Sequence, residues 1–147
     1  MRARVILVVV AAAFLGFAPA PLPRNERHRV DPTDVAGTWE LELWENDGQR
    51  ERHFEDTIHA QVTAKRFRLS TKVNNDRAED FSMRLHPEAS PPAFTWLRGG
   101  QVAFVGSYWL KKDRLTMIFA RGDRLEGRPV DFAAKAPYRF VLRRVKR

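Results

Sequence analysis

Residues 38–43 have the sequence Thr38-Trp39-Glu40-Leu41-Glu42-Leu43, and they decide the fold. Apolar and polar side chains alternate in them without a fault. Because successive side chains of a β-strand point to opposite faces of a sheet, this pattern predicts a half-buried strand. Asn46-Asp47-Gly48 follows, and glycine tolerates the positive φ that tight hairpin turns require. We therefore predict a first strand that turns back on itself.

The same period of two continues almost to the C-terminus. The predicted strands are a return strand at 49–56, a hairpin of 58–63 and 67–71, a strand at 81–86, a strand beginning at Phe94 and Trp96, a hairpin of 104–110 and 115–120, and a last strand at 138–145. Gly99-Gly100 predicts a turn. Residues 121–137 contain two glycines and two prolines, which predicts a long connection before the last strand.

These elements predict an all-β fold. Asp31-Pro32-Thr33-Asp34 is typical of a helix start, and Gly37 ends it after about one turn. About eight short strands without a long amphipathic helix are typical of a sandwich or of a closed up-and-down barrel. We favour an antiparallel up-and-down β-barrel over residues 31–147, because closure removes exposed sheet edges.

The first twenty residues are typical of a secretory signal peptide. Arg2 and Arg4 precede an uncharged apolar stretch, and Ala18-Pro19-Ala20 offers small residues at a cleavage site. The alternative is an uncleaved membrane anchor, but the stretch is short for a span and prolines follow it. We expect cleavage near Ala20, no stable membrane span afterwards, a flexible leader at 21–30, and export to the periplasm, cell envelope or medium.

Charge and cysteine content restrict the partners. The chain has 26 Lys+Arg against 18 Asp+Glu, a net charge of +8, and no cysteine. Removing residues 1–20 removes Arg2 and Arg4 and no acid, which leaves 24 against 18, or +6. This charge favours anionic partners or serves solubility alone, and its dispersion favours solubility. Without cysteine, disulfides and lipid anchoring through an acylated cysteine after the signal are excluded, so packing alone must hold the exported domain. We expect no nucleic-acid partner and a monomer.

Several segments resemble a domain family that is abundant in planctomycete bacteria and whose function is uncharacterised. The resemblance rests on Ala36-Gly37-Thr38-Trp39-Glu40 with Asn46-Asp47-Gly48, on 106–108 with 113–115, and on 128–132 with 140–144. It covers about residues 31–145, and the aromatic strand at 92–96 departs from the family pattern. The Gly-x-Trp opening is also similar to that of lipocalin-like barrels, in which the tryptophan plugs the closed end. The resemblance implies a barrel and supplies no catalytic residue.

We identify no catalytic, cofactor-binding or metal-binding residues in the sequence. His53, Glu55 and His59 share one face of a predicted strand, but the two histidines would lie about 20 Å apart on a straight strand, too far for one metal ion. Ser107 follows Gly106 but lacks the glycine that a nucleophile elbow needs. We therefore expect no cofactor and no enzyme activity.

The aromatic residues divide between two predicted faces. The predicted core includes Trp39, Leu41, Phe94, Trp96 and Tyr108, and Phe119 would help to fill the barrel. Alternation instead places Trp44 with Glu40 and Glu42, and Trp109 with Ser107 and Lys111, on polar faces. Trp44 and Trp109 therefore mark a surface binding site, or they are covered by the leader or by residues 121–137.

Three classes of function remain open from the sequence. The first is a non-enzymatic exported binding module, which takes a small apolar ligand inside the barrel or docks an envelope component on its surface. The second is a structural or accessory envelope domain with a filled core. The third is an enzyme of unidentified class, for which no residue pattern argues.

Overall fold

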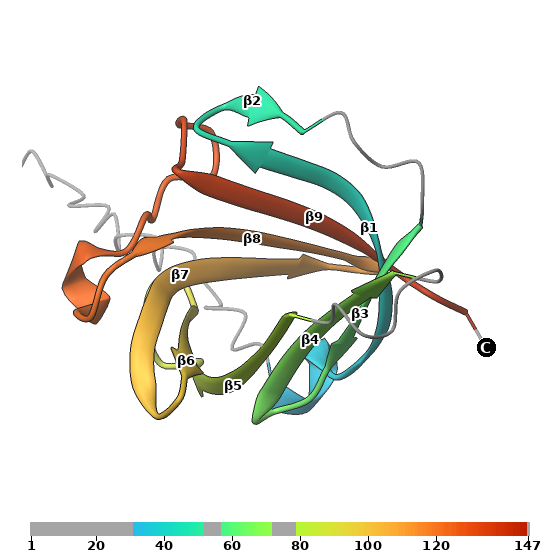
Figure 1. Cartoon of the computed structure of the whole chain (residues 1–147), viewed down its shortest axis with the longest axis horizontal. Coiled ribbons are helices and arrows are strands. Elements are labelled where there is room, and N and C mark those ends of the chain that lie inside the picture. Colours follow the sequence, from blue (N-terminus) through green and yellow to red (C-terminus); the bar gives the residue numbers. More distant parts are fainter. Residues whose placement is uncertain (1–30, 52–56, 72–78, 147) are drawn as a thin grey trace, which may run out of the picture.

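The computed structural model describes residues 31–51, 57–71 and 79–146. Within them the chain forms nine strands and two short 3-10 helices (Figure 1). The strands are β1 (Gly37–Asn46), β2 (Gln49–Arg50), β3 (Ile58–Val62), β4 (Arg66–Thr71), β5 (Glu79–His86), β6 (Ala93–Arg98), β7 (Gln101–Lys111), β8 (Arg114–Arg121) and β9 (Tyr138–Arg144). The 3-10 helices are η1 (Pro32–Val35) and η3 (Leu125–Gly127).

The strands form one antiparallel sheet that closes on itself. β1 pairs with β3, each strand from β3 to β8 pairs with the next, and β9 pairs with β1 from Trp39↔Arg144 to Asn46↔Tyr138. Eight strands therefore make a closed barrel, and the short β2 extends it beside β1. The predicted all-β, up-and-down antiparallel barrel is confirmed. The predicted return strand begins as β2, and residues 52–56 lie outside the described part of the chain.

Two hairpins turn as their sequences predict. Asp47 and Gly48, between β1 and β2, have φ values of 52° and 76°. Gly99 and Gly100, between β6 and β7, have values of 58° and 80°. Positive φ at both central residues gives a turn whose twist matches that of the flanking strands. Glycine and aspartate tolerate this conformation better than most residues, so these turns help to fix the strand register.

The 3-10 helix η1 lies at the end of the barrel where β1 begins and β9 ends (Figure 1). Asp31 caps η1 by accepting a hydrogen bond of 2.8 Å from the backbone N–H of Thr33. The buried Trp39 donates from its Nε1 to the carbonyl of Val35, at 3.0 Å. The indole thus sits against η1 at the start of β1.

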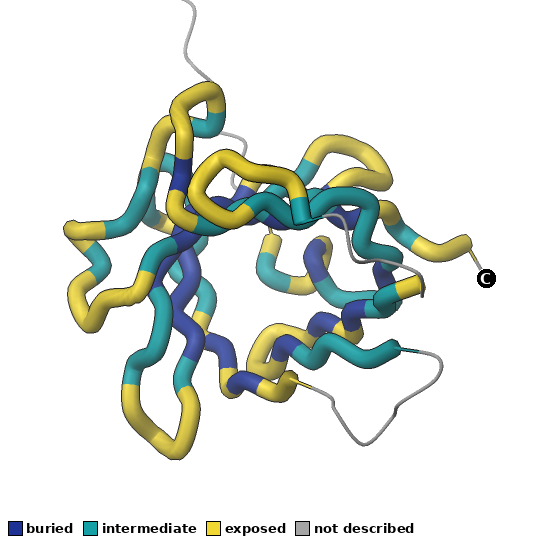
Figure 2. Tube along the Cα trace, turned by 45° about the horizontal axis from the view of Figure 1, so that its top comes forward, coloured by how far each residue is buried: buried dark blue, intermediate teal, exposed yellow. Residues whose placement is uncertain are grey.

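Aromatic rings fill the middle of the barrel. Phe67 of β4 stacks on Trp96 of β6 with ring centroids 4.4 Å apart, and it also lies 6.4 Å from Phe140 of β9. Trp96 in turn lies 4.8 Å from Phe119 of β8. These strands are not neighbours in the sheet, so the contacts cross the interior. Figure 2 shows the matching pattern, with buried residues within the strands and exposed ones at the turns.

The predicted core residues lie where the alternation places them. Trp39, Phe94, Trp96 and Tyr108 are buried, and the partly buried Leu41 packs against their cluster. Phe119 is buried in the same cluster. Inward placement of these side chains on β1, β6, β7 and β8 is therefore confirmed.

The predicted polar face of Trp44 is wrong. Pairing between β1 and β9 passes from Leu41↔Leu142 directly to Leu43↔Val141, which leaves Glu42 as an extra residue in a β-bulge. A bulge reverses the alternation for the rest of the strand. Trp44 therefore pairs with Phe140, packs against the core and makes an edge contact with the Phe140 ring at 5.5 Å.

Candidate functional site

Four neighbouring strands carry a row of uncharged residues on the outside of the barrel. Strand pairing aligns Trp109 of β7 with Thr116 of β8, Thr116 with Val141 of β9, and Val141 with Leu43 of β1. The residues on both sides of Trp109, Thr116 and Val141 belong to the core, so these three side chains point outward. Leu43 pairs with Val141 and precedes the inward-facing Trp44, so it points outward as well. We call these four residues the Trp109 row.

The connection between β8 and β9 lies against the outer wall of the barrel beside this row. Ser107 Oγ donates a hydrogen bond of 2.7 Å to the carbonyl of Pro129. Arg139 donates from Nη2 to the carbonyls of Phe132 and Ala134, at 2.9 and 2.8 Å. These bonds fix residues 129–134 over β7 and β9.

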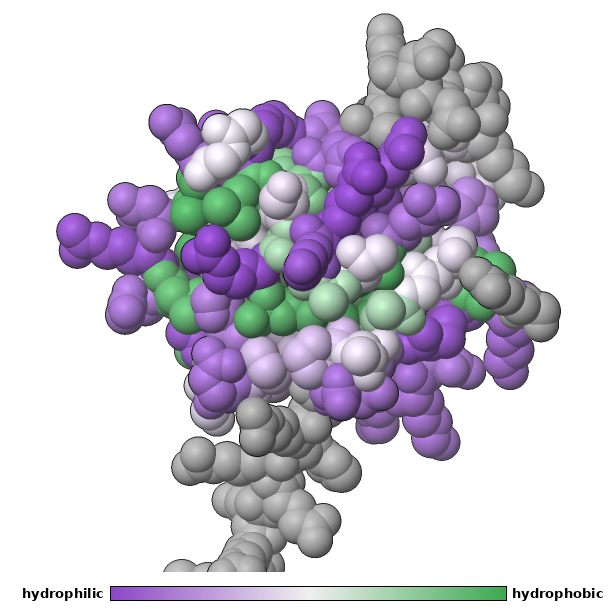
Figure 3. Space-filling view, turned by 90° about the horizontal axis from the view of Figure 1, so that it is seen from below, coloured by the Kyte–Doolittle hydropathy of each residue, from purple (hydrophilic) through white to green (hydrophobic). Residues whose placement is uncertain are grey.

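A second arginine ties the connection to the loop before β6. Arg128 donates from Nη1 to the carbonyl of Leu125, at 3.1 Å, and from Nη2 to that of Pro91, at 3.3 Å. Outward-facing residues of β6, β7 and β8 are buried as well, namely Ala93, Thr95, Val105, Ser107 and Ile118. The outer wall is therefore not uniformly polar, and Figure 3 shows apolar residues interspersed with hydrophilic ones on the face seen from below.

Trp109 stays exposed beside this connection. Its exposed fraction is 53%, and that of Val130 is 51%. The Phe132 ring meets the Trp109 indole edge-on, with centroids 6.0 Å apart. Since Pro129 is bonded at Ser107 and Phe132 lies at Trp109, Val130 runs along the same part of β7. We call Trp109, Val130 and Phe132 the Trp109 patch.

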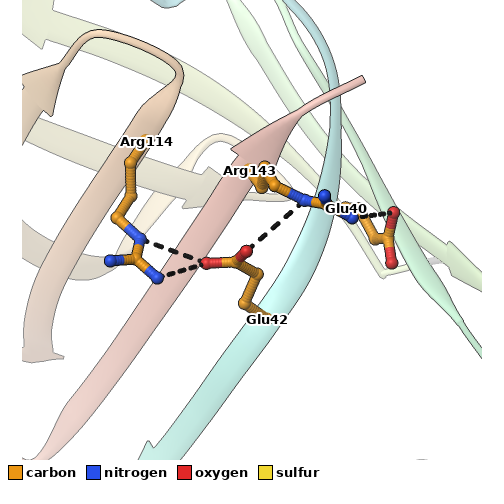
Figure 4. Close-up of polar contacts among 4 residues, drawn as sticks. All are labelled: Glu40, Glu42, Arg114 and Arg143. Carbon is orange, nitrogen blue, oxygen red and sulfur yellow. Dashed lines mark hydrogen bonds and ion pairs between the residues drawn. The ribbon is translucent and has the colours of Figure 1, made fainter. Parts of the chain in front are cut away.

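Charged residues form the next row along the same strands. Pairing aligns Lys111 with Arg114, Arg114 with Arg143, and Arg143 with Glu40. Figure 4 shows the ion pairs that Arg114 and Arg143 make with Glu40 and Glu42. Arg114 donates to Glu42 Oε2 from Nε and Nη2, at 3.1 and 2.7 Å. Arg143 lies 3.4 Å from Glu42 Oε1 and 3.3 Å from Glu40 Oε2.

This cluster of two arginines and two glutamates is balanced in charge, but its neighbours are not. Lys111 Nζ lies 5.9 Å from the centroid of the Trp109 ring, within the range of a cation–π contact. Lys111 and Lys112 have no ion pair within the described residues, whereas Asp113 is paired with Lys146 at 4.0 Å. The Trp109 patch is therefore bordered by the unneutralised positive charge of Lys111, and Lys112 follows it in the β7–β8 turn.

Two polar atoms inside the barrel have no hydrogen-bond partner among the described residues: Trp96 Nε1 and the Tyr108 hydroxyl. Both side chains are buried. Burial, with a smaller effect of the Glu88 carboxylate, raises the pKa of Tyr108 to about 12. A buried phenol with this pKa stays protonated at neutral pH and is a poor general base.

The two histidines in the described part of the chain, His59 and His86, do not share a site. His53 and Glu55 lie outside the described residues, and His59 is a half-buried residue of β3. His86 ends β5, with its Nε2 3.1 Å from Thr95 Oγ1 and its Nδ1 3.7 Å from Glu88. Over 31–51, 57–71 and 79–146, no group of three or more His, Asp or Glu residues is arranged to hold a metal ion.

Sequence reasoning thus identified one member of the patch and missed two. Trp109 lies on the outer face as predicted, whereas Trp44 does not accompany it. Val130 and Phe132 belong to a connection with no strand period, so no alternation indicated their place. Their signal was only that they are apolar residues in a segment otherwise rich in charge, glycine and proline.

None of the helices in the described ranges is long and apolar enough to span a membrane. No family model, curated protein or solved structure matches the chain.

Proposed function

We propose that the chain is a non-enzymatic, exported binding module that docks a component of the cell envelope through the Trp109 patch. The observation that carries the proposal is the 53% exposure of Trp109 on a strand of a closed barrel. Tryptophan at the centre of a small exposed patch is typical of the residues that dominate binding energy. The strand pairing holds it in place, so little conformational entropy is lost on binding.

The interior argues for surface binding rather than for a small apolar ligand inside the barrel. Phe67, Trp96 and Phe140 contact one another across it, although their strands are not neighbours. A barrel of eight strands is only just wide enough to be filled by its own side chains. A ligand of drug-like size would have to displace these rings.

The same ring contacts favour a second candidate, a structural or accessory envelope domain with a filled core. It differs from the first in what it requires of Trp109. A purely structural domain needs no exposed tryptophan, and replacing Trp109 would then leave attachment to the envelope unchanged.

Export rests on residues 1–20, which lie outside the described part of the chain. Mass spectrometry of the protein recovered outside the cytoplasm should give a chain that begins at Pro21. An intact Met1 in that material would contradict cleavage and favour the membrane-anchor alternative.

The docking proposal is tested by co-sedimentation with envelope fragments from the source cells. The protein is purified in the form that the cell exports, and Trp109→Ala is compared with Arg84→Ala. Arg84 is an exposed residue of β5 for which the structure gives no ion pair. We expect wild type and Arg84→Ala to sediment with the envelope and Trp109→Ala to stay in solution. Equal sedimentation of all three would contradict docking through the patch.

A further inference from the structure

The size of the Trp109 row restricts its partner. Four strands span three inter-strand spacings of about 4.8 Å, so the row is about 14 Å long, and same-face neighbours along a strand leave it about 7 Å wide. These dimensions give an area of roughly 100 Å2, whereas a stable interface with a folded protein buries about 800 Å2 on each partner. The row therefore suits one extended chain that lies across the strands.

The side chains of the row further restrict the chemical class of the partner. Trp109 presents an indole, Thr116 a hydroxyl, and Val141 and Leu43 aliphatic groups. A pyranose ring has one face of C–H groups, which packs on an indole, and hydroxyls at its edge, which bond to polar neighbours. The charged row with Arg114 and Arg143 lies one step along the same strands and places donors beside such an edge.

The charges beside the row indicate that the partner is negatively charged. Lys111 and Lys112 have no ion pair in the described structure, while Arg114 and Arg143 are shared with Glu40 and Glu42. Lys111 also lies against the indole, so its ammonium group is next to anything stacked on the ring. An anionic chain would meet the uncompensated positive charge of Lys111 here.

A lipid surface fits these features less well. Interfacial binding buries apolar side chains about 5–10 Å deep in the headgroup and acyl boundary. Thr116, Val141 and Leu43 are half-buried within a strand-built face, and only Trp109 and Val130 of this region are more than half exposed.

We infer that the Trp109 row binds an acidic polysaccharide, with a sugar ring stacked on Trp109 and a carboxylate of the chain facing Lys111. This inference rests on the proposed docking function and names the chemistry of the docked component. No bond is made or broken in it.

The test is titration of the exported protein with polygalacturonate, with neutral dextran and phosphatidylglycerol vesicles as alternative probes. We expect binding to polygalacturonate that weakens with added salt, and no binding to dextran. Trp109→Ala should weaken it by more than about tenfold, as for a central aromatic contact. Lys111→Gln should weaken it by about three- to tenfold, and Lys65→Gln, an exposed residue of the β3–β4 turn, should leave it unchanged. Urea midpoints equal to wild type exclude misfolding as the cause.

Three results would overturn the inference. They are no binding to polygalacturonate, a loss of affinity in Lys65→Gln equal to that in Lys111→Gln, or binding to the vesicles alone. If envelope sedimentation still depends on Trp109 in that case, docking stands and only the polysaccharide assignment fails. If envelope sedimentation is also independent of Trp109, both fail.

Discussion

The guanidinium carbon of Arg144 lies 4.3 Å from the centroid of the Trp39 indole ring. The same guanidinium donates from Nη1 to the carbonyl of Ala36, at 2.9 Å, and from Nη2 to that of Asp34. Arg144 ends β9, Trp39 lies near the start of β1, and the two carbonyls belong to the segment of η1. One side chain therefore fastens the N-terminal turn to both strands that close the barrel.

Replacing Arg144 should weaken the fold substantially. Arg144→Met removes a cation–π contact and two charged hydrogen bonds, so we expect a loss of about 2–4 kcal/mol in the free energy of unfolding. Trp39→Ala, at a site with no exposed surface, should cost about 3–5 kcal/mol. Urea titration measures both, with Arg84→Met as the control. A loss below about 0.5 kcal/mol for Arg144→Met would contradict this role.

Gly106 is expected to tolerate no side chain, for reasons of space rather than of backbone angle. A Cβ built on it would lie 2.5 Å from the carbonyl oxygen of Ile118 and 2.6 Å from Phe94 Cζ. A backbone atom cannot move aside cheaply, so Gly106→Ala should cost about 3 kcal/mol, the upper end for overpacking. Gly127→Ala is the matched control, since nothing lies within 4 Å of its Cβ. Similar thermal midpoints for the two variants would contradict the packing.

The alternation of apolar and polar residues predicted most of the barrel, but it misplaced Trp44 because of a β-bulge in β1. Trp39 and Leu41 point inward as their spacing requires, and β1 then gains one residue at Glu42, which turns Trp44 inward instead of Leu43. No single sequence pattern marks this bulge, because Glu42 itself fits a regular strand. The register that reveals it is set by β9, a hundred residues further along the chain.

Deleting Glu42 should therefore leave Trp44 in the core. The deletion removes the extra residue, so Leu41 and Leu43 become consecutive and Trp44 still faces Phe140. The expected cost is about 1 kcal/mol, chiefly from the lost ion pairs to Arg114 and Arg143. Glu42→Gln removes the same ion pairs and keeps the bulge, so it should cost less than about 1 kcal/mol. Both are measured by urea unfolding. A loss of about 3 kcal/mol or more for the deletion alone, as for a displaced aromatic core residue, would contradict the register in which Glu42 is the extra residue.

The pKa of Tyr108, raised by burial to about 12 from an ordinary 10.0, predicts a loss of stability in alkali. As the pH rises, the unfolded chain releases the phenol proton before the folded chain does. The stabilisation that the protonated phenol contributes is therefore complete below about pH 10 and is lost as the pH rises toward 12. Its size is roughly 2–3 kcal/mol, at about 1.4 kcal/mol per pKa unit.

Tyr108→Phe should abolish this part of the pH dependence. At neutral pH the variant should be as stable as wild type or slightly more so, because it removes a buried hydroxyl that has no hydrogen-bond partner in the described chain. Unfolding free energies from about pH 9 to about pH 12 test it. The same alkaline decline in wild type and Tyr108→Phe would contradict the assignment to this residue.

The binding surface was less predictable than the barrel. The outward position of Trp109 follows from its parity with Ser107 and Lys111 on a regular strand. The contact between Trp109 and Phe132 depends instead on how residues 129–134 are bonded to Ser107 and Arg139. The bond between Ser107 and Pro129 joins residues 22 positions apart in the sequence. Such side-chain to carbonyl bonds leave no periodic signal.

Hydroxyl-radical footprinting of Trp109, with and without isolated envelope, tests the central claim most directly. Trp109 is about half exposed while Trp39 and Trp96 are buried, so oxidation reports on this surface. The account predicts that envelope protects Trp109 from oxidation and leaves the slow oxidation of Trp39 unchanged. Equal oxidation of Trp109 in the two samples, under conditions in which the protein sediments with the envelope, would contradict docking through this surface.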